Sequence, residues 1–230
     1  MDLLPADTML DERDRGATVA LLPVGSFEQH GPHLPLTTDT LVASTLAAEL
    51  AAAYPVRRLP PLTISCSHEH AAWPGTVSIS ATTLAAVVRD VAASVHHAGG
   101  TALVLVNGHG GNYVLGNVVQ EASLGPMPMA LFPGEPDWDE ARAAAGLTTP
   151  ALTDMHAGEL ETSVLLHAHP HLVRPGYAQA DHVADDRRHL LSRGLSAYTE
   201  SGVVGRPSLA SAEKGSALLA SLVDSFAGYL

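Results

Sequence analysis

The chain has 230 residues, 46% of them hydrophobic, which is enough for the core of one large α/β domain or of two small ones. Its formal net charge of −12 argues against a nucleic-acid or anionic-membrane partner and fits a cytoplasmic protein. A single cysteine, Cys66, excludes an intramolecular disulfide, no apolar stretch is long enough for a membrane span, and the N-terminal residues do not resemble a signal peptide.

Strand-like and helix-like segments alternate along the chain. Val19–Val24 (VALLPV) is a short apolar run typical of a buried strand, and 39–53 is an Ala/Leu-rich segment that predicts a helix. Pro60 and Pro61 interrupt the next strand-like run, which is at best a broken strand over 56–64. The remaining predicted elements are a helix over 82–97, a strand over 101–106, a helix over 112–122, a strand over 127–132 and helices over 157–169 and 212–229, with loops over 147–154 and 202–211.

This alternation predicts one α/β domain over residues 1–230, a three-layer α/β/α sandwich in which helices cover both faces of a mainly parallel sheet. In such sheets, ligands bind beyond the carboxyl ends of the strands. Two polar, glycine-rich segments directly follow the two most apolar strands, so we expect them at the functional edge of the sheet.

The first polar segment runs from Glu28 to Thr40 and contains Glu28, His30 and Asp39, all competent ligands for zinc or manganese. Glu28 and His30 alternate, so an extended segment points both to one side. The chain is also rich in histidine, with 13 against 12 Lys plus Arg. Two simpler roles remain open: Asp39 can cap the next helix, and His33 can be a hydrogen-bonding loop residue.

The second polar segment, Asn107-Gly108-His109-Gly110-Gly111-Asn112, lies between a strand and a helix. Such a turn can bind phosphate at a helix N-terminus, but neither the Walker pattern nor the strict GxGxxG pattern is present. These patterns therefore do not explain the presence of His109, which is the candidate functional residue of this segment.

The third polar segment, Asp154 to Ser163, places three carboxylates and His156 at the start of an apolar helix. Acidic residues in a first helical turn are favoured by the helix dipole, so one of them can be purely structural. Glu159 and Glu161 lie about 200° apart around a helix, so at most one of them can face a given site.

A fourth stretch, Ser67 to Thr76, carries His70 and Trp73 and is typical of a loop that lines a substrate site. Its His-Glu-His string lacks the HExxH spacing of zinc proteases. We therefore expect Ser67, His70 and Trp73 to contact substrate or to be structural, rather than to bind metal.

Three ordered motifs resemble those of the creatininase family: PVGSFEQHGPHLPLTTDT, NGHGGN and HAGELETS. The segment SHEHAAWPGTVSIS and the last helix also resemble this family, so the similarity covers nearly the whole chain. The resemblance implies a compact α/β fold, a dinuclear metal site and a homo-oligomer, commonly a hexamer built from dimers.

The resemblance also implies residue roles. Metal-ligand positions fall on Glu28, His30, Asp39, His109 and Glu161. Asp39 falls on the bridging position, Glu161 on an acidic active-site position, and His156 on a catalytic or substrate-contacting position. Glu159 is then a first-turn acid or faces the substrate.

One departure concerns substrate. Creatininase carries an acidic residue two places after the histidine of the NGH motif, where this chain has Gly111. The departure argues against creatinine and gives Glu161 more weight as a ligand. Other branches with NGHGGN include a formamide-cleaving deformylase and a peptidase that matures the mycofactocin precursor; GVVGRPSLASAEKG near the C-terminus resembles the latter.

The predicted activity is hydrolysis of an amide-like C–N bond in a small molecule or short peptide by a metal-activated water. Two divalent ions, Zn²⁺ or alternatively Mn²⁺ or Fe²⁺, would share that water and polarise the carbonyl. His156 would carry a proton to the leaving nitrogen, and the backbone at Gly110 and Gly111 would hydrogen bond the oxyanion. A mononuclear hydrolase or isomerase and a non-catalytic binding protein are the alternatives.

Overall fold

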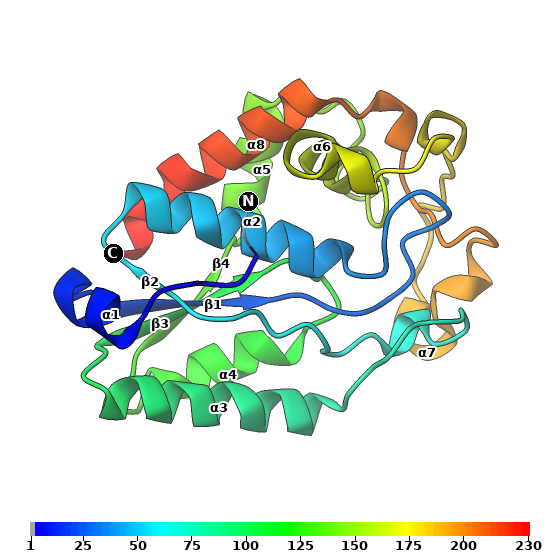
Figure 1. Cartoon of the computed structure of the whole chain (residues 1–230). Helices are drawn as coiled ribbons and strands as arrows, with labels where there is room; N and C mark the ends of the chain where they lie inside the picture. The colour runs from blue at the N-terminus through cyan, green and yellow to red at the C-terminus, as the bar shows by residue number, and fades with distance from the viewer. Residues whose placement is uncertain (1–2) are drawn as a thin grey trace.

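The computed structural model describes residues 3–230 and contains a parallel sheet of four strands (Figure 1). The strands lie in the order β2 (Arg57–Arg58), β1 (Val19–Val24), β3 (Ala102–Asn107) and β4 (Met129–Phe132). The two central strands end together, since Val24 pairs with Asn107. The segments that follow β1 and β3 therefore leave the sheet from the same edge, side by side.

Helices cover both faces of the sheet, as the sequence predicted (Figure 1). One face carries α3 (Ala81–His97) and α4 (Val114–Ala122). The opposite face carries α2 (Thr38–Ala53), α5 (Glu135–Ala144), α6 (Glu159–Ala168) and α8 (Ala212–Ser225). The α/β/α prediction is therefore confirmed.

The continuous apolar runs of β1 and β3 explain this layering, because a strand buried on both faces needs apolar side chains at every position. Leu21 and Val104 belong to the hydrophobic cluster under α2, α6 and α8. Leu22 and Leu105 belong to the cluster under α3 and α4. Successive side chains thus supply opposite cores.

Several boundaries differ from the sequence prediction. The broken strand over 56–64 contracts to Arg57–Arg58, because prolines cannot donate ladder hydrogen bonds. The helices predicted from residues 112 and 157 begin at Val114 and Glu159. The last predicted helix ends at Ser225 and continues as a 3₁₀ turn, Phe226–Tyr229.

Helices α1 (Met9–Arg15) and α5 were not predicted, because both are rich in charge and lack an apolar stripe of clear helical period. The N-terminus of α5 is held by the Asp137 carboxylate, which accepts from the Gly134 N–H at 2.8 Å. The other short elements are α7 (Leu190–Arg193) and the 3₁₀ turns His68–His70, Pro170–Leu172, Tyr177–Gln179, Leu195–Ala197 and Pro207–Leu209.

The 3₁₀ turn His68–His70, α7 and the irregular segment that precedes α8 gather beyond the carboxyl ends of β1 and β3 (Figure 1). They cover the edge of the sheet where the polar segments emerge. Within residues 3–230, every helix is too short or too polar to traverse a lipid bilayer.

Candidate metal centre

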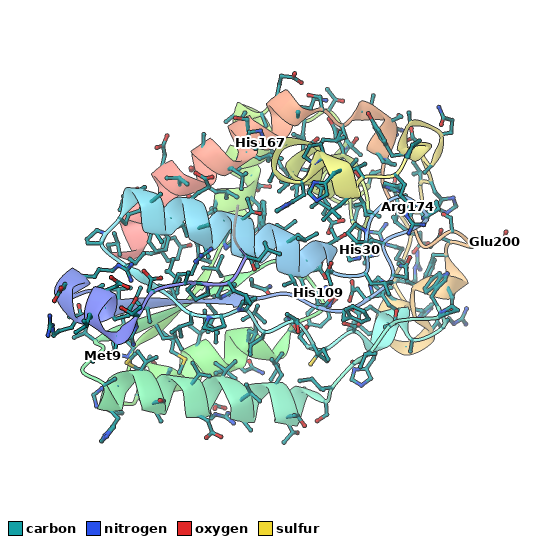
Figure 2. The ribbon with its side chains drawn as sticks, viewed as in Figure 1. Met9, His30, His109, His167, Arg174 and Glu200 are labelled. Carbon is teal, nitrogen blue, oxygen red and sulfur yellow. The ribbon has the colours of Figure 1, made fainter. Side chains whose placement is uncertain are left out.

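The five predicted metal ligands converge beyond the carboxyl ends of the two central strands. Figure 2 labels His30 and His109, which follow β1 and β3. The residues that join the cluster are Glu28, His30, Asp39, His109 and Glu161. Four of them are almost completely buried, while the side chain of Glu161 is 18% exposed. The cluster is thus shielded from solvent on the side of the sheet and is accessible to solvent at Glu161.

Asp39 lies at the centre of this cluster. One carboxylate oxygen, Oδ1, is 3.0 Å from His30 Nε2, and the other, Oδ2, is 3.1 Å from His109 Nδ1. The Ser26 hydroxyl donates to Oδ2 at 2.6 Å. The residue at the N-cap of α2 is Thr37, so the contacts of the Asp39 carboxylate are those of the cluster and not those of a helix cap.

Three histidines are oriented by backbone carbonyls. His30 Nδ1 lies 3.1 Å from the Glu28 carbonyl, His109 Nε2 lies 2.7 Å from the Cys66 carbonyl, and His156 Nε2 lies 2.6 Å from the Gln29 carbonyl. A carbonyl oxygen can only accept, so each of these nitrogens carries the proton. The other nitrogen of each ring is left to face carboxylates. This is the arrangement typical of histidines that bind metal, in which the second nitrogen donates to a carbonyl or carboxylate.

Glu28 is buried with neither carboxylate oxygen hydrogen bonded to the described part of the chain. Its Oε2 lies 3.2 Å from His109 Nε2, and its Oε1 lies 3.2 Å from His70 Nε2 and 3.8 Å from His156 Nδ1. Leaving a carboxylate buried without a partner is unfavourable, so this pair of oxygens fits a bound cation.

His70 belongs to the surroundings of Glu28. The Gln29 side-chain amide donates to His70 Nδ1 at 2.9 Å, so the proton of a neutral ring is on Nε2, the nitrogen that lies 3.2 Å from Glu28 Oε1. Since His70 is only 1% exposed, its contacts match the structural alternative better than direct contact with substrate.

Charge interactions within the cluster shift its pKa values strongly. Burial, reinforced by the nearby charge of Asp39, raises the pKa of Glu28 to about 8. Burial alone would lower the pKa of His109, but the carboxylates of Glu28 and Asp39 raise it to about 10. Burial, followed by the charge of His30, lowers the pKa of His156 to about 4. In the metal-free protein, protons therefore take the place that cations would occupy, and metal binding would release them.

Three groups of side chains are close enough to hold an ion, with ligand atoms within 4.8 Å of one another. The groups are Glu28–Asp39–His109, His30–Asp39–Glu161 and Glu28–His30–His156. The first two share Asp39. Mixed nitrogen and carboxylate donors suit Zn²⁺, Mn²⁺ and Fe²⁺, so the residues present fit the implied metals.

The structure separates the two glutamates of the third polar segment. Glu161 Oε1 lies 3.8 Å from His30 Nε2, and its Oε2 accepts from the Ala157 N–H at 2.5 Å. The carboxylate of Glu159 is fully buried elsewhere, where it accepts from Thr149 Oγ1 at 2.6 Å and from Lys214 Nζ at 2.5 Å. The structure thus brings Glu161 into the cluster and leaves Glu159 in a structural ion pair, away from the substrate-facing position that we considered for it.

His156 precedes helix α6 and pairs instead with Val204 in an isolated β-bridge. The next residue, Ala157, adopts a left-handed backbone with φ of 52°. A non-glycine residue in this region is strained by about 1–2 kcal/mol. This turn aims the Ala157 N–H at Glu161 and places His156 beside His30, with ring centroids 4.2 Å apart.

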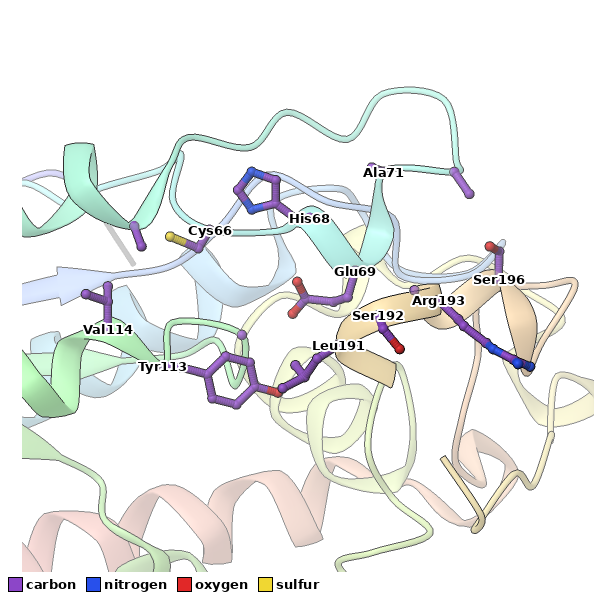
Figure 3. Close-up of a pocket in the computed structure, with 14 residues that line it drawn as sticks. Cys66, His68, Glu69, Ala71, Tyr113, Val114, Leu191, Ser192, Arg193 and Ser196 are labelled. Carbon is purple, nitrogen blue, oxygen red and sulfur yellow. The ribbon is translucent and has the colours of Figure 1, made fainter. Parts of the chain in front are cut away.

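Two cavities adjoin the cluster. One, of about 690 Å³, is lined by residues that include His109, Gly110 and Glu161. The other, of about 500 Å³, is lined by residues that include Glu69, Gly111 and Tyr113 (Figure 3). We call these the Glu161 cavity and the Glu69 cavity. Gly110 and Gly111, predicted to face substrate, thus line different cavities.

The remaining predicted substrate residues lie on the loop after β2. Ser67 is fully buried, and its hydroxyl has no hydrogen-bond partner in residues 3–230. Trp73 has its ring centroid 6.3 Å from that of His70, and its indole N–H donates to the Glu200 carbonyl at 3.3 Å. Trp73 therefore ties this loop to the segment that covers the site.

Sequence reasoning missed several residues that shape the cluster. Ser26 binds Asp39, the carbonyls of Gln29 and Cys66 orient histidines, and Glu69 lies beside His109. Of these residues, only Glu69 belongs to a pattern that the sequence analysis noted, the His-Glu-His string. Backbone groups carry no signal of residue type, so their roles could not be found in the sequence.

Comparison with known proteins gives consistent relatives. The family model described as "Creatininase: Creatinine amidohydrolase" matches residues 7–230. The chain is 35% identical to the mycofactocin precursor peptide peptidase of Mycobacterium ulcerans, over 89% of this chain and 81% of that protein. It is 27% identical to the 3-dehydro-scyllo-inosose hydrolase of Thermotoga maritima, over 93% of this chain and 76% of that protein.

Solved structures share the fold. A putative creatinine amidohydrolase from Bacteroides fragilis superposes with a TM-score of 0.80 at 26% identity, covering 97% of this chain and 92% of that one. Two creatininase structures at 22% identity, described as a manganese form and a Zn–Zn form, superpose with TM-scores of 0.79 and 0.80, each over 100% of this chain and 97% of the other.

Proposed function

Because the chain belongs to the creatininase family, we propose that it is a metal-dependent amidohydrolase that uses two divalent ions to hydrolyse an amide C–N bond in a short peptide. The observation that carries the metal dependence is the orientation of three buried histidines by backbone carbonyls around the unpartnered carboxylate of Glu28. Such an arrangement leaves three ring nitrogens and several carboxylate oxygens directed at one another, and divalent metal ions would stabilise it.

In this proposal, Glu28, Asp39 and His109 hold one ion, and His30, Asp39 and Glu161 hold the other. Asp39 is the shared ligand, because its two oxygens face His30 and His109 separately. Three carboxylates supply a charge of −3, which two divalent ions and one hydroxide would balance. Zn²⁺ suits these ligands, as do Mn²⁺ and Fe²⁺.

Bound ions would polarise the scissile carbonyl and lower the pKa of a water in the site. The water oxygen adds to the carbonyl carbon, the C–N bond breaks, and the leaving nitrogen takes up a proton. His156 is placed to move that proton, because its Nδ1 is free of hydrogen bonds to the described residues and lies 3.8 Å from Glu28 Oε1. The backbone at Gly110, which lines the Glu161 cavity, is placed to donate to the developing oxyanion.

Two observations favour a peptide over creatinine as the substrate. The relative that cleaves the mycofactocin precursor peptide is 35% identical over most of both chains. In addition, Gly111 replaces the acidic residue that creatininase carries after its NGH motif. The Glu161 cavity, at about 690 Å³, is large enough for a segment of a few residues. A small cyclic substrate is the second candidate, and the T. maritima hydrolase supports it.

Metal analysis of the purified protein tests this proposal. We expect about two equivalents of metal, loss of peptide hydrolysis on chelation, and recovery with Zn²⁺, Mn²⁺ or Fe²⁺. One equivalent would favour a mononuclear hydrolase or isomerase, and none would favour a binding protein. Full activity in demetallated protein would contradict the proposal, and faster hydrolysis of creatinine or a cyclic ketone than of any peptide would reassign the substrate.

We further propose that residues 1–230 act as one catalytic domain within a cytoplasmic homo-oligomer, most simply a hexamer. The single domain is supported by the packing of α8 against α6, which carries Glu161. The oligomer rests on family resemblance alone. Sedimentation should show an assembly larger than a dimer, and a monomer at micromolar concentration would count against it.

A further inference from the structure

Glu69 is an acidic residue beside the cluster for which the proposed mechanism has no role. It lies in the 3₁₀ turn His68–His70, and its side chain is only 11% exposed. Its Oε1 lies 3.7 Å from His109 Nε2, a distance that permits charge attraction but is too long for a hydrogen bond. Figure 3 shows the carboxylate reaching into the Glu69 cavity, near Tyr113 and Leu191.

The reason for a glycine at position 111 is space. The backbone there is outside the left-handed region, so other residues could adopt it. A Cβ at Gly111, however, would lie 2.0 Å from Glu69 Oε1 and 2.3 Å from His109 Nε2. Real Cβ atoms essentially never come this close to other atoms, so a side chain at position 111 would force Glu69 or His109 to move. The absence of a side chain at Gly111 thus leaves room for the present separation of Glu69 and His109.

Three oxygens lie near His109 Nε2, those of the Cys66 carbonyl, Glu28 Oε2 at 3.2 Å and Glu69 Oε1, and they have different effects on the ring. The Cys66 carbonyl accepts the Nε2 proton at 2.7 Å and sets the tautomer. The Glu69 carboxylate adds a negative charge on the same side, which polarises the Nε2–H bond and makes Nδ1 a stronger ligand for a metal ion. Nδ1 is the nitrogen that faces Asp39.

We propose that Glu69 is a positioning residue of the metal centre, which acts on His109 from the side opposite Asp39 and tightens metal binding at the Glu28–Asp39–His109 group. This inference rests on the proposed metal dependence. Gly111 contributes by leaving room for the pair. The loop after β2 thereby takes part in metal binding as well as lining a cavity.

Metal affinity, measured by competition between the purified full-length protein and a chelator for Zn²⁺, tests the proposal. Glu69→Gln keeps the size of the side chain but removes its charge, and we expect one of the two equivalents to bind about 10–100-fold more weakly. Glu69→Asp keeps the charge and should lose less affinity than Glu69→Gln. Gly111→Ala should weaken the same equivalent, because the methyl group displaces the pair.

Matched controls come from α4. Glu121→Gln alters an exposed glutamate paired with Arg89, and Gly116→Ala adds a methyl group that meets nothing within 4 Å. Both should bind metal as the wild type does. Urea unfolding of the metal-free Glu69→Gln protein should match the wild type, which separates weaker metal binding from a folding defect.

Two results would overturn the inference. If Glu69→Gln binds both equivalents as tightly as the wild type, Glu69 only lines its cavity. If Glu69→Asp is weaker than Glu69→Gln, size and not charge is what matters. A wild-type protein that binds no Zn²⁺ would instead refute the proposed metal dependence, and the same titration reports that outcome separately.

Discussion

Asp39→Asn is expected to destabilise the metal-free protein and to destabilise the metal-bound protein still more. In the metal-free protein, burial would raise the pKa of Asp39, but the charges of His30 and His109 hold it well below its usual value, so the ionised carboxylate stabilises the fold at neutral pH. The amide oxygen of the variant can still accept from Ser26, but the contacts with His30 and His109, at 3.0 and 3.1 Å in the wild type, lose their charge. Loss of a charged partner from a buried donor costs about 1–3 kcal/mol. The metal-free variant should therefore unfold at a lower urea concentration than the metal-free wild type.

With metal present, the difference in stability between the two proteins grows. An ion that binds only the folded protein adds about 2.7 kcal/mol to the free energy of unfolding at a free concentration of 100 Kd, and each occupied site contributes in this way. Asp39 belongs to both proposed sites, and a neutral amide is a much poorer ligand than a carboxylate. Asp39→Asn should lose at least one equivalent of metal and the corresponding increase in stability.

The assay is urea unfolding of both proteins, with chelator and with excess Zn²⁺, together with metal analysis. Asp90→Asn, at an exposed position of α3, is the control and should behave as the wild type in both conditions. If Asp39→Asn retains two equivalents and the full metal-induced increase in stability, Asp39 is only a buried hydrogen-bonding residue, and our account of the cluster is wrong.

Further substitutions test the other roles. Glu161→Gln should lose both bound metal and turnover, which metal analysis and a peptide hydrolysis assay measure. Glu159→Gln should keep both, but its free energy of unfolding in urea should fall by about 1–3 kcal/mol, because Lys214 and Thr149 lose a buried partner. The reverse pattern, with metal lost only from Glu159→Gln, would reverse our assignment of the two glutamates. His156→Ala should keep its metal and hydrolyse peptide about 10²–10⁴-fold more slowly at saturating metal; an unchanged rate would exclude it as the proton carrier.

The parts of the fold that could be predicted from the sequence are those dictated by burial. The apolar run of β1 was predicted to the residue, and that of β3 to within one residue, because strands covered on both faces need no polar alternation. The short helix α1 has no buried residue, so its sequence lacks the apolar period that reveals other helices. The start of α6 could not be predicted, because Ala157 has a left-handed backbone and the helix begins only after it. Alanine rarely adopts this conformation, so the sequence does not indicate it.

The candidate site was predictable as a set of residue types but not as an arrangement. Glu28, His30 and His109 were recognisable because they follow strands that end at the same edge of the sheet. Helical geometry allowed at most one of Glu159 and Glu161 to face the site, and it could not relate either of them to His156, because His156 lies before the helix. Glu69 was missed because its contact with His109 joins segments that are far apart in the chain and depends on a missing side chain at Gly111.

The partners that orient the cluster are largely main-chain atoms. Carbonyl oxygens of Cys66, Glu28 and Gln29 hold the three histidines, and the N–H of Ala157 holds Glu161. An evolving chain can exchange the side chain of a residue such as Cys66 without losing its carbonyl, provided that the backbone keeps its path. Substitutions at such positions are therefore constrained by the path of the backbone and not by the chemistry of the side chain.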